Sequence, residues 1–147
     1  MYGAYQLLSR LIHKTNFPVF VGIIDDETDL VCLFKDALSN IADVRAFGFT
    51  DPKSALVHFR DNHEKYKCII SDYRMPSMNG IEFLEQAKEI NAGVARILIS
   101  AFDIADQAFR DCQCVDKFLQ KPIRISDWIE QVQKCLISVE IEKQNLE

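Results

Sequence analysis

The chain has 147 residues, of which 48% are hydrophobic, and its formal net charge is -5 at pH 7. This size and composition fit one globular domain with a substantial apolar core. A net negative charge is poorly suited to binding a phosphate backbone, so direct nucleic-acid binding is not expected.

The cysteine pattern and the apolar segments limit the class of protein further. The five cysteines are scattered and contain no C-x-x-C pair: Cys32, Cys68, Cys112, Cys114 and Cys135. We therefore expect free thiols in a cytoplasmic protein, with neither a disulfide framework nor a zinc site. No apolar run approaches the ~20 residues needed to cross a bilayer, so no transmembrane segment is expected.

Short apolar segments alternate with amphipathic stretches from Phe20 onward. This alternation is typical of repeated βα units and predicts an α/β fold, a parallel sheet covered by helices on both faces. The five predicted strands are Phe20–Ile24, Val44–Phe49, Cys68–Ser71, Ala95–Ser100 and Val115–Leu119.

The charge content of these strands predicts their order in the sheet. In the first, third and fourth strands, the segments Phe20–Ile24, Cys68–Ile70 and Ile97–Ile99 are nearly all apolar. The second strand contains Arg45, and the fifth contains Asp116 and Lys117. Edge strands tolerate charge better than central strands, which are buried on both faces. The prediction is a doubly wound, five-stranded parallel sheet of order 2-1-3-4-5, with ligands bound at the carboxyl ends of the strands.

Three segments are expected along the chain. Residues 1–17 form an N-terminal extension, residues 18–139 the α/β domain, and residues 140–147 a polar C-terminal tail. In the extension, Leu7, Leu8, Leu11 and Ile12 lie at the spacing of one helical face. Docking on the domain, partner binding and contact with a membrane surface are all open for this segment.

Polar side chains are predicted to meet where the strands end. They are Asp25 and Asp26 after the first strand, Asp72 after the third, Ser100 at the end of the fourth and Lys121 after the fifth. Three converging carboxylates repel one another unless a cation lies among them, and Mg²⁺ suits a site of carboxylates and phosphate oxygens. The hydroxyl and the ammonium group would then bind an incoming phosphoryl group.

The segment from Ile69 to Gly80, IISDYRMPSMNG, resembles the phosphoacceptor segment of CheY-like receiver domains of response regulators. Three further motifs occur in the family's order: Asp25-Asp26, Ser100-Ala101 and Lys121-Pro122. The resemblance covers about Phe20 to Val139. It implies a magnesium-dependent module of two-component signalling that receives a phosphoryl group from a sensor histidine kinase or a phosphotransfer protein and catalyses only its own phosphorylation and dephosphorylation.

The resemblance also implies a role for each matching residue. Asp72 accepts the phosphoryl group, Asp26 binds Mg²⁺ directly and Asp25 binds it through water. Asp72 and the backbone carbonyl of Arg74 complete the metal site.

Further residues match the parts of the family that respond to phosphorylation. Ser100 corresponds to the switch hydroxyl, Lys121 to the phosphate-binding lysine and Phe118 to the switch aromatic, where tyrosine is the more familiar residue. Pro122 is expected to follow a cis peptide bond. Arg74 and Phe102 flank the phosphoryl position and could alter its rate of hydrolysis.

Three other functions remain as alternatives. A phosphatase of the haloacid-dehalogenase type needs an Asp-x-Asp element, which Asp25-Asp26-Glu27 does not supply. A nucleotide- or flavin-binding module would need a glycine-rich loop after the first strand. A degenerate receiver would act as an interaction scaffold without phosphorylation.

Two structural interpretations accompany this function. Gly80 is expected to permit a positive φ before the third helix. The family's output face, formed by the fourth helix, the fifth strand and the last helix, is expected to bind a downstream protein or a second copy through residues such as Lys117, Asp127, Trp128 and Gln131. Trp128 lies at the edge of the apolar helical stripe, so it is expected either as a partly exposed interface anchor or as a packed residue.

Overall fold

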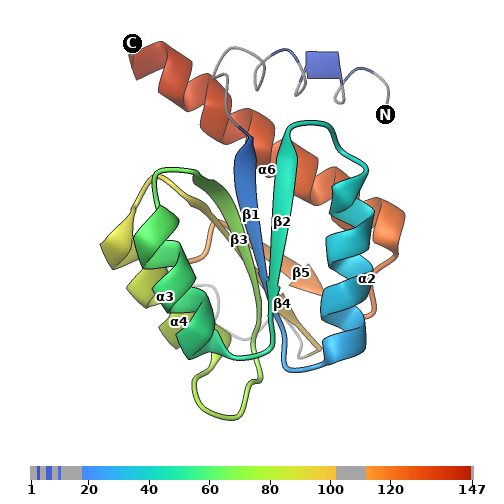
Figure 1. Cartoon of the computed structure of the whole chain (residues 1–147), viewed down its shortest axis with the longest axis vertical. Coiled ribbons are helices and arrows are strands. Elements are labelled where there is room, and N and C mark those ends of the chain that lie inside the picture. Colours follow the sequence, from blue (N-terminus) through green and yellow to red (C-terminus); the bar gives the residue numbers. More distant parts are fainter. Residues whose placement is uncertain (1–2, 4–5, 8–9, 11–17, 102–111, 147) are drawn as a thin grey trace.

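The computed structural model describes residues 18–101 and 112–146, together with residues 3, 6, 7 and 10. Five parallel strands form one sheet in the order β2-β1-β3-β4-β5 (Figure 1). The strands are β1 (Val19–Ile24), β2 (Val44–Phe49), β3 (Tyr66–Asp72), β4 (Ala95–Ser100) and β5 (Lys117–Gln120). The predicted fold class and strand order are therefore confirmed, and β5 begins two residues later than expected.

Helices cover both faces of the sheet. Helices α2 (Thr28–Ser39) and α6 (Ile125–Leu146) lie on one face, and α3 (Pro52–Asn62) and α4 (Gly80–Ile90) lie on the other (Figure 1). The predicted fourth helix, with Phe102, and Leu8, Leu11 and Ile12 of the N-terminal extension lie outside the described residues.

Alternate residues of the strands supply two separate cores. On β1, Val21 and Ile23 pack with α2 and α6, whereas Phe20 and Ile24 pack with α3 and α4. Successive side chains of a strand point to opposite faces, so one short strand contributes to both cores. The middle parts of the central strands, such as Cys68–Ile70 and Ile97–Ile99, are consequently apolar on both faces, as predicted from their sequences.

Trp128 belongs to the first core. It is fully buried, and its ring stacks on Phe34 of α2 with 4.3 Å between the ring centroids. The expectation of a partly exposed interface anchor is therefore wrong, and the alternative of a packed residue holds. A position beside the helical stripe is buried here because α6 also packs against α2.

Helix α6 continues through residues that were expected to form a polar tail. It ends at Leu146, and Glu140 is only 2% exposed. The sequence is polar in this region, but the helix keeps its contact with the domain beyond residue 139. Within the described residues, no helix combines the length and apolarity needed to span a membrane.

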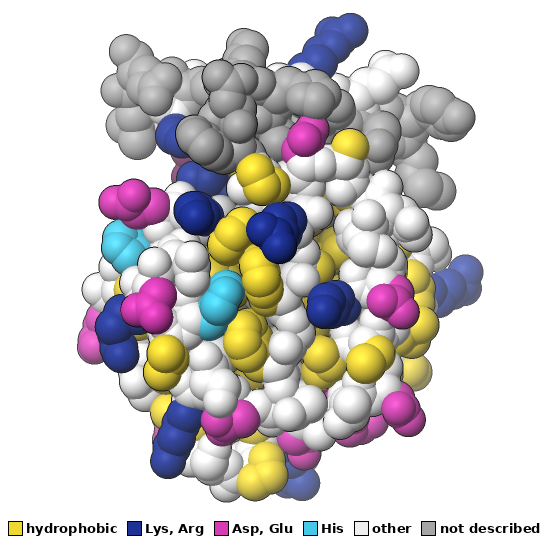
Figure 2. Space-filling view, viewed as in Figure 1, with side chains coloured by type: hydrophobic (Ala, Val, Ile, Leu, Met, Phe, Trp, Pro, Cys, Tyr) yellow, Lys and Arg dark blue, Asp and Glu magenta, His cyan; other side chains and the backbone are white. Residues whose placement is uncertain are grey.

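The open edge of the sheet at β2 is lined with aromatic side chains. Figure 2 shows apolar groups gathered in a band over this strand, with charged groups on both sides. The Arg45 guanidinium lies 5.6 Å from the ring centre of Phe47 and 5.8 Å from that of Phe20. A charged residue at an edge strand opposes pairing with other chains, so Arg45 protects the edge as well as covering the rings.

Gly80 is required for a steric reason. A Cβ atom at this position would overlap the backbone oxygen of Asp72 and the side chain of Leu98. The expected positive φ is wrong, since no described glycine has one. The close approach lets the Gly80 amide donate a hydrogen bond to Tyr73 O at 2.8 Å, which places the start of α4 against the end of β3.

We predict that Gly80→Ala lowers the free energy of unfolding by about 1–3 kcal/mol, because the added methyl group overpacks this contact. Urea denaturation measures the loss. The control is Gly93→Ala, whose Cβ would approach only Asn91 Oδ1 at 3.4 Å. Equal effects of the two substitutions would contradict the steric explanation.

Candidate functional site

Four strands deliver the predicted site residues to one end of the sheet. Asp25 follows β1, Asp72 ends β3, Ser100 ends β4 and Lys121 follows β5. Parallel strands bring their carboxyl ends to the same edge, here the lower end of the sheet in Figure 1. The grouping expected from the sequence is thus present.

Lys121 lies between two carboxylates. Its Nζ atom is 2.9 Å from Asp25 Oδ2 and 3.1 Å from Asp72 Oδ1. The Lys121 amide donates to Ser100 O at 2.8 Å, and the following peptide bond to Pro122 is cis, as predicted. β4 therefore fixes the backbone from which the ammonium group reaches the acidic residues.

The three aspartates form a set of oxygen donors. Asp25, Asp26 and Asp72 each offer a carboxylate oxygen, and these atoms lie within 4.8 Å of one another. Asp25 is buried, and its Oδ1 accepts a hydrogen bond from the Glu27 amide at 2.9 Å. A hard cation that prefers oxygen ligands fits this donor set, so the residues present suit Mg²⁺.

A cavity of about 250 Å³ opens beside these carboxylates. Its lining consists of Asp26, Glu27, Asp72, Arg74, Ser100, Ala101 and Lys121. Glu27 was not predicted as a site residue. The signal in the sequence that could have indicated it was its position directly after Asp25-Asp26. The cavity gives a small anion access to Asp72 and Lys121, because both residues line it.

The surroundings of Asp72 raise the pKa of its carboxyl group above the ordinary aspartate value. Burial raises the pKa of this carboxyl group, and the charge of Asp25 raises it further, while Lys121 lowers it by less. For Lys121, burial lowers the pKa of the ammonium group, but the hydrogen bonds and charges of Asp25 and Asp72 raise it more. The site therefore holds more negative charge than Lys121 alone balances.

Asp72→Asn is expected to stabilise the metal-free protein at neutral pH by about 0.5–2 kcal/mol, as for other substitutions that relieve unfavourable functional groups. The raised pKa means that the folded protein binds this proton more tightly than the unfolded chain does. The stabilising contribution is therefore present in acid and is lost as the pH rises through the folded-state pKa of Asp72.

The measurement is urea unfolding in excess chelator across this range of pH. The difference between wild type and Asp72→Asn should shrink below the ordinary aspartate pKa of 3.8. A variant that is less stable than wild type at neutral pH would show that the ion pair with Lys121 outweighs burial and repulsion.

The remaining predicted residues lie around this centre. Ser100 is buried and lines the cavity, as does Arg74. Phe118 is half-buried on β5 opposite Leu98, where it packs against the core formed with α3 and α4 and does not line the cavity. Phe102 lies outside the described residues.

Comparison with known proteins identifies the family. The model of the response regulator receiver domain matches residues 21–133, so the chain belongs to this family. The chain is 29% identical over 139 residues to the response regulator protein TodT of Pseudomonas putida. This match covers 91% of this chain and 58% of TodT. It is 27% identical to the cyclic di-GMP phosphodiesterase response regulator RpfG of Xanthomonas campestris, over 76% of this chain and 30% of RpfG.

Solved structures share the fold. An uncharacterised protein from Neptuniibacter caesariensis is 29% identical, with a TM-score of 0.78 over 89% of this chain and 97% of that chain. A CheY-like receiver domain protein from Methanospirillum hungatei is 21% identical, with a TM-score of 0.76 over 85% of this chain and 98% of that chain. The chain is a receiver domain of two-component signalling, and it spans less than two thirds of TodT and RpfG.

Proposed function

We propose that Asp72 accepts a phosphoryl group from a histidine kinase or a phosphotransfer protein, with Mg²⁺ as the cofactor. The observation that carries this proposal is the placement of Lys121 Nζ between Asp25 and Asp72, at the wall of a cavity lined by acidic and hydroxyl groups. The pairing leaves Asp72 beside a fixed positive charge while the cavity leaves it accessible to a donor.

The chemistry is a phosphoryl transfer to a carboxylate nucleophile. A carboxylate oxygen of Asp72 forms a bond to phosphorus as the bond between phosphorus and the donor's histidine nitrogen breaks. In this proposal Lys121 balances negative charge on the phosphoryl oxygens, and the Ser100 hydroxyl donates a hydrogen bond to one of them. The support for both roles is that Lys121 and Ser100 line the same cavity as Asp72. The fold supplies positioning, which is the main requirement of this reaction.

Asp25, Asp26, Asp72 and the Arg74 carbonyl would hold Mg²⁺. When bound, the ion supplies positive charge that offsets repulsion between the carboxylates and the incoming anion. The surplus negative charge around Asp72 explains why the chain's own residues need this help.

The output is proposed to be a change in a protein-binding face. Lys117 on β5 and Asp127 on α6 are exposed, and Gln131 is half-buried, so part of the predicted face is available to a partner or a second copy. Ser100 lies at the end of β4, and β5 pairs with β4 at Leu98 and Phe118. Movement of Ser100 toward a phosphoryl group would therefore act on the strand that carries Phe118.

Intact-mass measurement with acetyl phosphate tests the proposal. We expect the mass of one phosphoryl group to be added to the wild type in the presence of Mg²⁺, and little addition in excess chelator. Asp72→Asn should remove the labelling, whereas Asp36→Asn, at an exposed position on α2, should retain it. Undiminished labelling of Asp72→Asn would contradict the assignment of Asp72 as the acceptor. A wild type that is not labelled but still binds partners would favour the scaffold function.

A further inference from the structure

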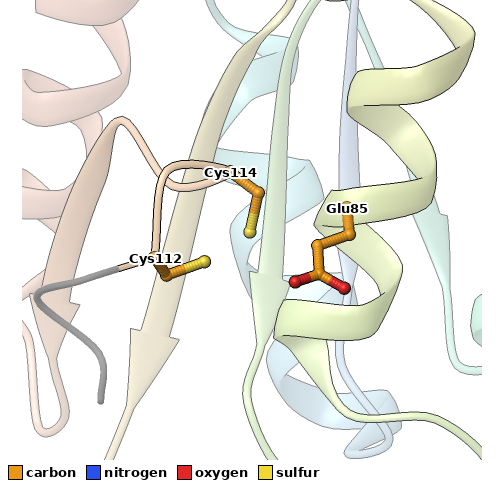
Figure 3. Close-up of side chains that lie close together, drawn as sticks. All are labelled: Glu85, Cys112 and Cys114. Atoms are coloured by element: carbon orange, nitrogen blue, oxygen red, sulfur yellow. The ribbon is translucent and has the colours of Figure 1, made fainter.

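A second group of side chains with ligand atoms that a metal ion could use lies away from the aspartates. Glu85 projects from α4, and Cys112 and Cys114 lie in the connection that leads to β5 (Figure 3). Their side chains point toward one another, with the two sulfur atoms and a carboxylate oxygen within 4.8 Å of each other. The residues are separated in sequence and meet only through the fold.

The connection that carries the two cysteines is fixed by hydrogen bonds. Arg96 is buried on β4, and its Nε donates to Cys114 O at 2.7 Å. The Arg96 amide donates to Asp116 Oδ2 at 2.8 Å, and Lys88 Nζ lies 3.4 Å from Gln113 O. These contacts hold the backbone on both sides of Cys114, so hydrogen bonds within the fold position this cysteine.

We propose that Glu85, Cys112 and Cys114 bind a thiophilic divalent cation of the zinc class. Two thiolates and a carboxylate are ligands that zinc accepts, whereas hard ions such as Mg²⁺ disfavour sulfur. Three protein ligands leave a fourth position for water, as in open zinc sites. Each thiol releases its proton to solvent when it coordinates the metal.

The geometry needs only a small adjustment. Ligand atoms about 2.3 Å from a tetrahedral zinc ion are about 3.8 Å apart. Glu85 is exposed and Cys112 is half-buried, so both side chains can move toward this spacing while solvent reaches the fourth position. Cys114 is buried, and its Sγ lies 3.8 Å from Ile81 O, a weak contact that metal coordination would replace.

Metal binding would connect α4 directly to the segment before β5. The expectation of no zinc site was based on the lack of a C-x-x-C pair. That criterion does not detect a C-x-C pair, here Cys112 and Cys114, that is completed by a glutamate distant in sequence. The proposal does not depend on phosphorylation of Asp72, because the two sites share no residue.

Cobalt(II) provides the test because its thiolate complexes absorb strongly in the near ultraviolet. We expect Co²⁺ added to the reduced full chain in excess Mg²⁺ to produce sulfur-to-cobalt charge-transfer absorption that saturates at one equivalent and is bleached by Zn²⁺. Co²⁺ at the aspartates would give no such absorption, since that site offers oxygen ligands only.

Single substitutions assign the ligands. Cys112→Ser should abolish the charge-transfer band of a bound cysteine pair, and Glu85→Gln should weaken Co²⁺ binding at least about tenfold. Cys32→Ser and Cys135→Ser are the controls and should leave the absorption unchanged, because neither cysteine belongs to the cluster. Cys114→Ser is expected to behave like Cys112→Ser. Because Cys114 is buried, its substitution can also disturb the fold, so the test rests on the exposed Glu85 and the half-buried Cys112.

Thermal unfolding gives a second readout. Zn²⁺ in excess of the protein by one equivalent should raise the melting temperature of the wild type and of Cys32→Ser. It should not raise the melting temperature of Cys112→Ser. The proposal is overturned if the cobalt complex lacks the charge-transfer band or if the band survives in Cys112→Ser with unchanged affinity.

Discussion

Lys121→Met is expected to slow phosphorylation of Asp72 by about 100-fold or more and to lower the free energy of unfolding by about 3 kcal/mol. Methionine keeps the apolar stem of lysine but removes the ammonium group that lies 3.1 Å from Asp72 and 2.9 Å from Asp25. Both carboxylates then lose their positive partner in a site where burial already raises the pKa of Asp72.

Labelling rates with acetyl phosphate and urea unfolding measure the two effects. The matched control is Lys117→Met, at an exposed lysine on β5, which should leave the labelling rate within a factor of two or so of wild type, as for ordinary surface substitutions. The stability loss of Lys121→Met should diminish in acid, where Asp72 is protonated. A normal labelling rate would remove Lys121 from the proposed chemistry.

Trp128→Ala is expected to cost about 3–5 kcal/mol of stability, because it empties the space between α6 and α2. Trp128→Phe should cost less, since a phenyl ring can still stack on Phe34. The indole Nε1 is buried without a hydrogen-bond partner among the described residues, so its removal carries no further loss.

Urea unfolding separates the two substitutions, and the emission of this single tryptophan provides a second measurement. A buried indole should emit at short wavelength and resist quenching by acrylamide. A small loss of stability in Trp128→Ala, comparable to that of a surface substitution, would contradict the burial of Trp128 and favour an exposed interface residue.

The apolar and charged patterns of the strands predicted most of the fold. Continuous apolar runs placed β1, β3 and β4 in the centre, and Arg45 and Lys117 marked the two edges. The burial of Trp128 was left open because it depends on which neighbouring helix α6 contacts, and helix periodicity describes only the side that faces the sheet. Glu140 was assigned to a tail because a polar sequence does not reveal that a helix continues.

The acidic site was largely predictable, because parallel strands bring their carboxyl ends together once their order is known. The resemblance to receiver domains then implied a separate role for each of Asp25, Asp26 and Asp72, and these roles stay predictions. Gly80 was correctly singled out, but the reason is the approach of Asp72 and Leu98, which no local pattern contains. The cluster at Glu85 was missed for the same reason, since its members come from two distant segments.

Strand β5 has four residues and, in the described sheet, pairs with β4 alone, so few backbone bonds determine its alignment. Arg96 and Asp116 are joined at the start of this pair by the Asp116 amide to Arg96 O at 2.8 Å and by the side-chain contacts of both residues. Slippage of β5 by one residue would break this junction and reverse the faces of its side chains. It would also withdraw Lys121 from Asp25 and Asp72, so the Arg96 junction keeps the ammonium group in place from the opposite end of the sheet.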